Sequence, residues 1–246
     1  MKQFAILLLL VTPLLSIAQK TNNGTIDISG TQGIAFFRFS DDKLISQNRR
    51  NETGTATLNS YMVQYCWAPT NKNYYIKSGI GITNHFMLAR RGLTLFTNPR
   101  FTWVSDDGAT SFFLQKVTLK NKNVTLPISA GYKVQLSKTN KNYVALFGLQ
   151  FNNNFLINSS STITVDSTGG LPNAKQMQAI KDSYENRAAQ YILSIQPVAD
   201  FRIPLNNNVQ INLMAMPLTF YTKSWYTNFS NGPIAATFSI GVNYKL

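Results

Sequence analysis

The chain has 246 residues, a formal charge of +13 at pH 7 and only ten acidic residues. One cysteine, Cys66, excludes an intramolecular disulfide framework, and one cysteine with one histidine, His85, makes no recognisable zinc or calcium site. We therefore expect no metal and no cofactor. The cations are spread along the chain instead of forming one stripe, so we also expect no nucleic-acid partner.

The first 18 residues have the organisation of a secretory signal peptide. Lys2 precedes an apolar run from Phe4 to Leu15, and Ser16 and Ala18 supply the small residues of a cleavage site. The run is shorter than the roughly 18 continuous apolar residues that a membrane-spanning helix needs. We expect cleavage after Ala18 and export of residues 19–246 as a single domain.

Alternation of apolar and polar residues dominates the exported part and is strictest at its C-terminus. From Ile234 to Leu246 every even position is apolar or large, and the odd positions are small or polar. Because side chains on a strand alternate between faces, such segments have one apolar and one polar face. We expect eight of them, at 24–39, 55–67, 74–88, 123–136, 141–155, 188–203, 208–222 and 232–246.

The connections between these strands alternate between long and short. The short ones, 68–73, 137–140 and 204–207, are rich in turn-forming residues. A soluble β-protein has no reason to separate loop lengths by parity, whereas outer-membrane barrels have short periplasmic turns and long extracellular loops. We therefore predict an all-β fold, an eight-stranded antiparallel transmembrane β-barrel in the outer membrane, with both termini periplasmic. The alternation loses its phase at Pro217, which indicates a β-bulge.

Residues 171–190 break the strand pattern inside one of the long loops. Pro172 suits the first turn of a helix, and Met177, Ile180 and Tyr184 recur at helical spacing. We expect a short helix in this extracellular loop. It either caps the barrel mouth with its own apolar face or docks a partner.

Three segments, VTLPISAGYKV, YVALFGLQF and the terminal FSIGVNYKL, together with the signal peptide, resemble the small outer-membrane β-barrel domain of Bacteroidota, the PorT-like family. The resemblance covers the mature chain, and it implies no catalytic residue because the family shares no active site. The C-terminus also resembles the signal read by the barrel assembly machinery, which implies that machinery as a partner in biogenesis. The residues that carry this signal are Ser239, Gly241, Tyr244 and Leu246, with Leu246 where Phe is usual.

The polar face of the strands carries charged side chains that are expected to meet inside the barrel. Buried charges must be paired or solvated, so we expect Asp200 to contact one or more cations. Eight strands leave an interior just wide enough to be filled by side chains, which favours a closed lumen over a conducting pore. The expected lumen network consists of Lys77, Lys133, Gln196, Asp200, Arg202 and Lys245.

Basic residues in the long loops would face the phosphates of lipopolysaccharide in the outer leaflet, to which Arg and Lys make charge-assisted contacts. Outer-membrane lipid and lipopolysaccharide are therefore expected partners. The strongest candidates for these contacts are Arg90, Arg91 and Arg100, and Arg49, Arg50, Lys116, Lys120 and Lys122 add to the same basic excess.

Three functions remain open. The preferred one is a non-enzymatic structural or interaction scaffold that acts through its extracellular loops, in envelope integrity or in surface or secretion assembly, with an unidentified surface or periplasmic protein partner. The second is a narrow channel for small solutes. The third is a rim hydrolase in which His85 works with a loop aspartate, although paired loop aspartates are more often solvated surface charges. The candidate aspartates are Asp41, Asp42, Asp106 and Asp107.

Overall fold

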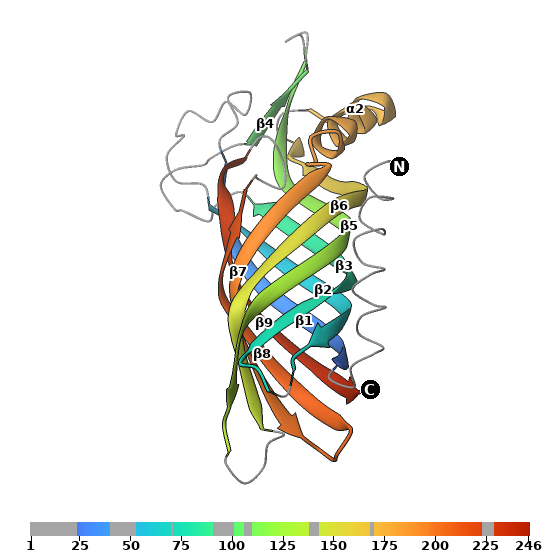
Figure 1. Cartoon of the computed structure of the whole chain (residues 1–246). Helices are drawn as coiled ribbons and strands as arrows, with labels where there is room; N and C mark the ends of the chain where they lie inside the picture. The colour runs from blue at the N-terminus through green and yellow to red at the C-terminus, as the bar shows by residue number, and fades with distance from the viewer. Residues whose placement is uncertain are drawn as a thin grey trace.

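The computed structural model describes residues 24–39, 53–69, 71–90, 101–105, 110–137, 143–167, 170–222 and 229–246. Most of these residues form strands that run obliquely around one axis (Figure 1). In chain order the elements are β1 (Gly24–Phe39), β2 (Thr53–Trp67), β3 (Tyr74–Arg90), β4 (Phe101–Val104), β5 (Ser111–Gln135), β6 (Val144–Val165), α2 (Ala174–Glu185), β7 (Tyr191–Pro204), β8 (Val209–Tyr221) and β9 (Phe229–Lys245).

The sheet closes on itself. Its strands follow the order β3-β2-β1-β9-β8-β7-β6-β5, and an additional antiparallel pairing joins β3 to β5. The first and last strands are neighbours along most of their length, with Ile28 opposite Val242. The short strand β4 pairs only with the projecting part of β5 and stands outside the ring. The predicted closed barrel of eight antiparallel strands is therefore confirmed.

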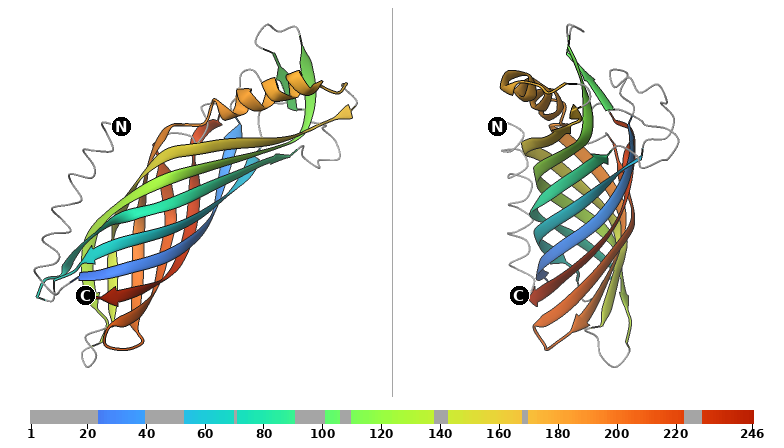
Figure 2. Two further views of the ribbon diagram at one scale, coloured as in Figure 1. Left: turned by 90° about the vertical axis from the view of Figure 1, so that its right-hand side faces the viewer. Right: turned by 180° about the vertical axis from the view of Figure 1, so that it is seen from behind.

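The two ends of the barrel differ in their connections. At one end, called the turn end, β2, β5 and β7 end and β3, β6 and β8 begin after few residues, and the start of β1 and Leu246 lie at the same end. The loop end holds β4 and α2, which project beyond the ring of strands (Figure 2). The predicted helix is confirmed as α2, although it spans only the middle of residues 171–190. Among the described residues, no helix is long and apolar enough to cross a membrane.

Two strands are much longer than the sequence predicts. β5 begins at Ser111 instead of residue 123, and β6 ends at Val165 instead of residue 155. The added residues of β5 and β6 pair with each other, with Thr118 opposite Thr162, and β4 extends the same ribbon. The alternation is inverted there, because Val117 and Leu119 are buried while Lys120 is exposed. The outward-apolar pattern of the later part of β5, with exposed Ile128 and Val134, therefore does not continue into it.

The bulge predicted near Pro217 is present. Pairing of β8 with β9 shifts register between Met216 and Thr219, and the β7–β8 pairing is interrupted between Ile195 and Ala199. Pro197 lies in that interruption. Because proline has no backbone N–H to donate, the two prolines account for the break in this part of the ladder.

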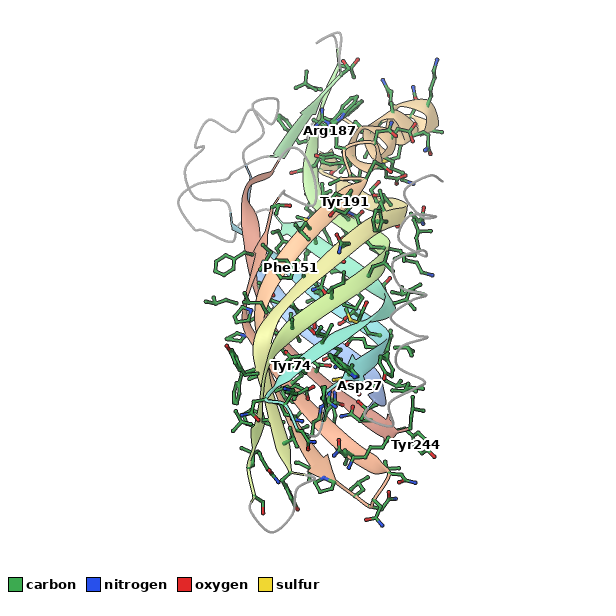
Figure 3. All side chains as sticks on the ribbon, viewed as in Figure 1. Asp27, Tyr74, Phe151, Arg187, Tyr191 and Tyr244 are labelled. Carbon is green, nitrogen blue, oxygen red and sulfur yellow. The ribbon has the colours of Figure 1, made fainter. Side chains whose placement is uncertain are left out.

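The outer surface of the barrel is apolar between the two ends. Ile28 and Ile240, for example, are 60% and 57% exposed. Aromatic side chains gather toward the turn end, where the rings of Trp67 and Tyr74 meet edge to face at 5.6 Å, and Figure 3 shows Tyr74 and Tyr244 in this region. Other exposed apolar side chains are Ile34, Val63, Ile80, Ile82, Ile128, Phe147, Leu149, Phe151, Phe201, Phe238 and Val242. The strands thus turn apolar side chains outward, as a barrel surrounded by lipid requires.

Candidate functional site

Four charged side chains meet inside the barrel near its turn end. Asp27 Oδ2 lies 2.7 Å from Lys77 Nζ and 2.8 Å from Arg202 Nη2. Asp200 Oδ2 lies 3.2 Å from Arg202 Nη2 and 3.7 Å from Lys77 Nζ. All four residues are buried, and Figure 3 shows Asp27 within the ring of strands. This charge network of two carboxylates and two cations is electrically neutral.

The network links strands that lie apart in the sheet. Asp27 comes from β1, Lys77 from β3, and Asp200 and Arg202 from β7. The Arg202 guanidinium also donates from Nη1 to Thr25 Oγ1 at 3.0 Å, and Thr25 in turn donates to Asp27 Oδ1 at 2.9 Å. A planar guanidinium presents several donors in a fixed fork, so one arginine can bridge two strands in a single geometry. The network therefore crosses the lumen and fills it.

An apolar cluster closes the lumen on the turn-end side of the charges. It consists of Cys66, Tyr75 and Leu146, each at most 2% exposed. The Tyr75 ring reaches the wall at Gly148, where an added Cβ would lie 2.6 Å from the Tyr75 hydroxyl oxygen. Glycine at this position therefore makes room for the ring.

On the other side of the charges the lumen contains a small polar cavity. Hydrogen bonds link its wall, with 2.6 Å between the hydroxyls of Thr83 and Thr125 and a 2.8 Å bond from Thr125 to Asn154 Oδ1. It has room for roughly one or two water molecules. The lining includes Ser29, Thr31, Ser60, Gln64, Thr83, His85, Gln150, Asn152, Asn154, Ser194, Gln196, Met214, Met216 and Tyr221.

His85 lies in this cavity wall and is buried. Its Nδ1 is 3.3 Å from Asn123 Nδ2, and its ring meets that of Tyr221 edge to face, with 6.2 Å between centroids. The four loop aspartates that the rim-hydrolase hypothesis needs lie outside the described residues, so that hypothesis stays a prediction. Within the described part of the chain, no three His, Cys, Asp or Glu side chains gather as a metal site.

A second and larger apolar cluster closes the loop end. Ala35, Ala56 and Ala235 contribute from the lumen side of β1, β2 and β9, and Ile180 and Tyr184 contribute from α2. The apolar face of the helix, with its buried Ile180 and Tyr184, therefore packs into one cluster with the inward-facing side chains at the loop end.

Polar contacts hold α2 in place. Trp103 of β4 donates from Nε1 to Ser183 Oγ at 2.9 Å, and Glu185 Oε1 accepts from the Ser161 backbone N–H and hydroxyl at 2.7 and 2.8 Å. The helix begins with a capping box between Asn173 and Gln176.

The structure brings together three of the six predicted lumen residues, Lys77, Asp200 and Arg202. The ion pairs of the charge network do not include the other three, and a single network of all six stays a prediction. Gln196 lines the cavity and accepts from Thr219 Oγ1 at 2.9 Å. The remaining two, Lys133 and Lys245, lie partly exposed at the turn end. Lys133 donates to the backbone oxygens of Ala68 and Pro69. Lys245 stands opposite Thr25 in the pairing of β9 with β1.

Sequence reasoning missed Asp27, which makes the shortest ion pair of the network. Its signal was the charge itself. A carboxylate between Ile26 and Ile28 on an alternating strand must face away from the apolar surface, and it then needs a cation inside the barrel.

The remaining predicted residues fall in several places. Ser239 faces inward and donates to the Gly30 carbonyl at 3.0 Å, whereas Tyr244 and Leu246 are exposed. Their role as an assembly signal, with Gly241, stays a prediction. Arg90 is the last residue of β3 and stands opposite Lys116. Arg91, Arg100 and the expected signal peptide lie outside the described residues.

The chain is similar to solved structures of outer-membrane barrels at low sequence identity. No protein-family model matches the chain and no curated protein matches it, so the PorT-like resemblance stays a prediction. The Neisserial surface protein A is 8% identical with a TM-score of 0.43, over 91% of this chain and 97% of the other. Ail of Yersinia pestis is 9% identical with a TM-score of 0.30, over 90% and 98%. With TM-scores below 0.5 these matches add nothing to the strand pairing, which alone defines the fold.

Proposed function

We propose that the protein is a non-enzymatic integral outer-membrane barrel with a closed lumen, which acts as a structural or interaction scaffold through its loop end. The observation that carries this proposal is the succession of three closures along one lumen. An apolar cluster around Tyr75 lies at the turn end, the charge network comes next, and the apolar cluster packed against α2 lies at the loop end. A small polar cavity lies between the last two.

Placement in a membrane is supported by the inverted distribution of side chains. The outward face carries exposed Ile, Val, Leu and Phe, whereas the inward face carries amides, hydroxyls and charges. A water-soluble barrel of this size needs the opposite arrangement. A closed ring also satisfies the backbone hydrogen bonds of its strands without water, as a lipid environment demands. Short turns at one end support periplasmic termini and an outward-facing loop end.

The proposed partners follow from this placement. They are outer-membrane lipid and lipopolysaccharide around the wall, the barrel assembly machinery during biogenesis, and an unidentified protein at the surface or in the periplasm. The projecting ribbon of β4, β5 and β6 with α2 is the part that rises above the ring of strands and is best placed to meet a surface partner (Figure 2).

The alternative function is a narrow channel for small solutes, which the polar cavity favours. Transport would require the charge network and both apolar clusters to separate. Because the network joins β1, β3 and β7 in one neutral group, opening it means exposing four charges together. A closed scaffold is therefore a better interpretation of this lumen than a channel.

Conductance of the refolded mature protein in a planar bilayer tests the proposal. Heat-modifiable migration on a gel first establishes that a barrel has formed. We expect a folded and electrically silent protein, and Lys175→Gln on the exposed side of α2 should be silent as well. Discrete conductance steps in the wild-type protein that change or vanish in Arg202→Met would show that the lumen is a pathway, and would overturn the closed scaffold.

A further inference from the structure

The outer wall of the barrel changes character abruptly where β3, β5 and β6 run side by side toward the loop end. Lys122 of β5 lies between Asn84 of β3 and Asn158 of β6. The next outward row holds Lys120 between Phe86 and Ser160. Both lysines are exposed on the outer face. These six residues form two adjacent rows, called the lysine rows below.

The wall on the turn-end side of the lysine rows is apolar. The adjacent outward row consists of Ile82, Val124 and Phe155 on the same three strands. Outward rows on a strand are about 7 Å apart, since two residues separate them. The surface therefore passes from hydrocarbon to amide and ammonium groups within one row, as the surface of a membrane protein does where the acyl chains end and the headgroups begin.

The lysine rows hold an excess of donors and positive charge. Lys120 Nζ lies 5.7 Å from the centroid of the Phe86 ring, which places that ammonium over the outer face of the wall. The neighbouring amides of Asn84 and Asn158 and the hydroxyl of Ser160 are further donors. Among the described residues, no carboxylate forms an ion pair with either lysine. An anion with several oxygens fits such a set.

We infer that the lysine rows bind the phosphorylated headgroup of a lipopolysaccharide in the outer leaflet, with its acyl chains against Ile82, Val124 and Phe155. The inference rests on the proposed placement in the outer membrane, and it assigns the contact to the barrel wall. The arginines expected for this contact from the sequence lie at or beyond the end of β3. Membrane anchoring of long cationic side chains supports the same arrangement, because their stems pack on the apolar wall while their charges reach the headgroups.

Lipopolysaccharide binding to the refolded full-length protein in detergent micelles tests the inference, with bound lipid counted by native mass spectrometry. The test variant is Lys120→Gln/Lys122→Gln, and Lys120→Arg/Lys122→Arg keeps the charge. Lys175→Gln/Lys181→Gln on α2 removes the same charge from the same end of the molecule and is the matched control. We expect affinity about tenfold weaker for the first variant, since two charge-assisted contacts are lost, and wild-type affinity for the other two.

Two comparisons separate the headgroup from other sources of binding. Enzymatically dephosphorylated lipopolysaccharide should bind the wild-type protein as weakly as the intact lipid binds the double glutamine variant. Inorganic phosphate at the same concentration should not displace the lipid. Equal binding of the dephosphorylated lipid, displacement by phosphate, or unchanged affinity in Lys120→Gln/Lys122→Gln would each overturn the assignment. None of these outcomes bears on whether the lumen conducts, so failure here is distinct from failure of the closed scaffold.

Discussion

Two layers that fill the lumen at different levels use different chemistry. Near the turn end, four buried charges balance one another, and each has a partner at a fixed position. At the loop end, small and apolar side chains lie beneath a helix. Removing one buried ion leaves another uncompensated, whereas removing apolar volume weakens packing by an amount that local relaxation reduces. The charged layer therefore fixes the geometry of the barrel, and the apolar layer attaches a cap to it.

The largest expected effect comes from unbalancing the charged layer. Asp27→Asn leaves Lys77 and Arg202 with one carboxylate between them, so we expect the free energy of unfolding to fall by about 3–5 kcal/mol. Urea titration of the protein in lipid vesicles, read from the folded and unfolded bands on a gel, measures this. The double variant Asp27→Asn/Lys77→Met restores neutrality and should recover most of the loss. If the double variant is less stable than the single one, charge balance is not what the network contributes.

The apolar layer should respond locally. Ile180→Ala removes a fully buried side chain of α2, and we expect docking of the helix to weaken by about 3 kcal/mol. Hydrogen exchange of residues 174–185 should accelerate while the urea midpoint of the barrel stays near that of the wild type. A fall in barrel stability as large as that of Asp27→Asn would show that the apolar layer stabilises the barrel itself and not only the docking of α2.

Crowding of the turn-end wall should cost less than either change. Gly148→Ala would place a Cβ 2.2 Å from the Ala130 carbonyl oxygen of the neighbouring strand and 2.6 Å from the Tyr75 hydroxyl oxygen. Both neighbours must shift, so we expect a loss of about 1–3 kcal/mol in the free energy of unfolding. Gly30→Ala is the matched control, because its Cβ would meet the Tyr61 ring at an ordinary 3.7 Å. The same urea titration compares the two. Equal losses would show that the close approaches at Gly148 do not determine the cost.

The smallest effect concerns the start of the cap. Asn173→Ala removes the side chain that accepts from the Gln176 backbone N–H at 2.9 Å, and we expect α2 to lose about 1 kcal/mol. Hydrogen exchange in the first turn of α2 measures this. Lys175→Ala, on the exposed face of the same helix, should change exchange far less. Similar acceleration in both variants would mean that capping does not hold the first turn.

The sequence predicts the face of each strand well and the height of each side chain poorly. Alternation places Lys77, Asp200, Arg202 and Lys133 on the inner face, because neighbouring side chains on a strand point to opposite sides. It does not determine which of them share a level, since that depends on the tilt and stagger with which the ring closes. Lys133 consequently lies at the turn end, whereas Lys77 reaches Asp27.

The projecting ribbon was missed for another reason. Its apolar residues, such as Val117 and Leu119, face inward and pack in one cluster with α2, whereas the strands of the barrel turn their apolar residues outward. The alternation is therefore present but in the opposite phase to that of the barrel strands. The lysine rows, in contrast, were visible as basic residues in the sequence, but only the pairing of β5 with β3 and β6 shows that Lys120 and Lys122 stand on the outer wall.

The charge network also constrains how the barrel is made. Asp27 and Arg202 are 175 residues apart in the chain, and their contact requires β1 and β7 to be in place around a common interior. An early hairpin of β1 and β2 in lipid would carry an uncompensated carboxylate, which is costly in hydrocarbon. Strand-by-strand insertion is therefore disfavoured, and the strands must enter the membrane together with closure of the ring. Burial of the ions is then a late step, and it stabilises only a chain whose strands are correctly paired.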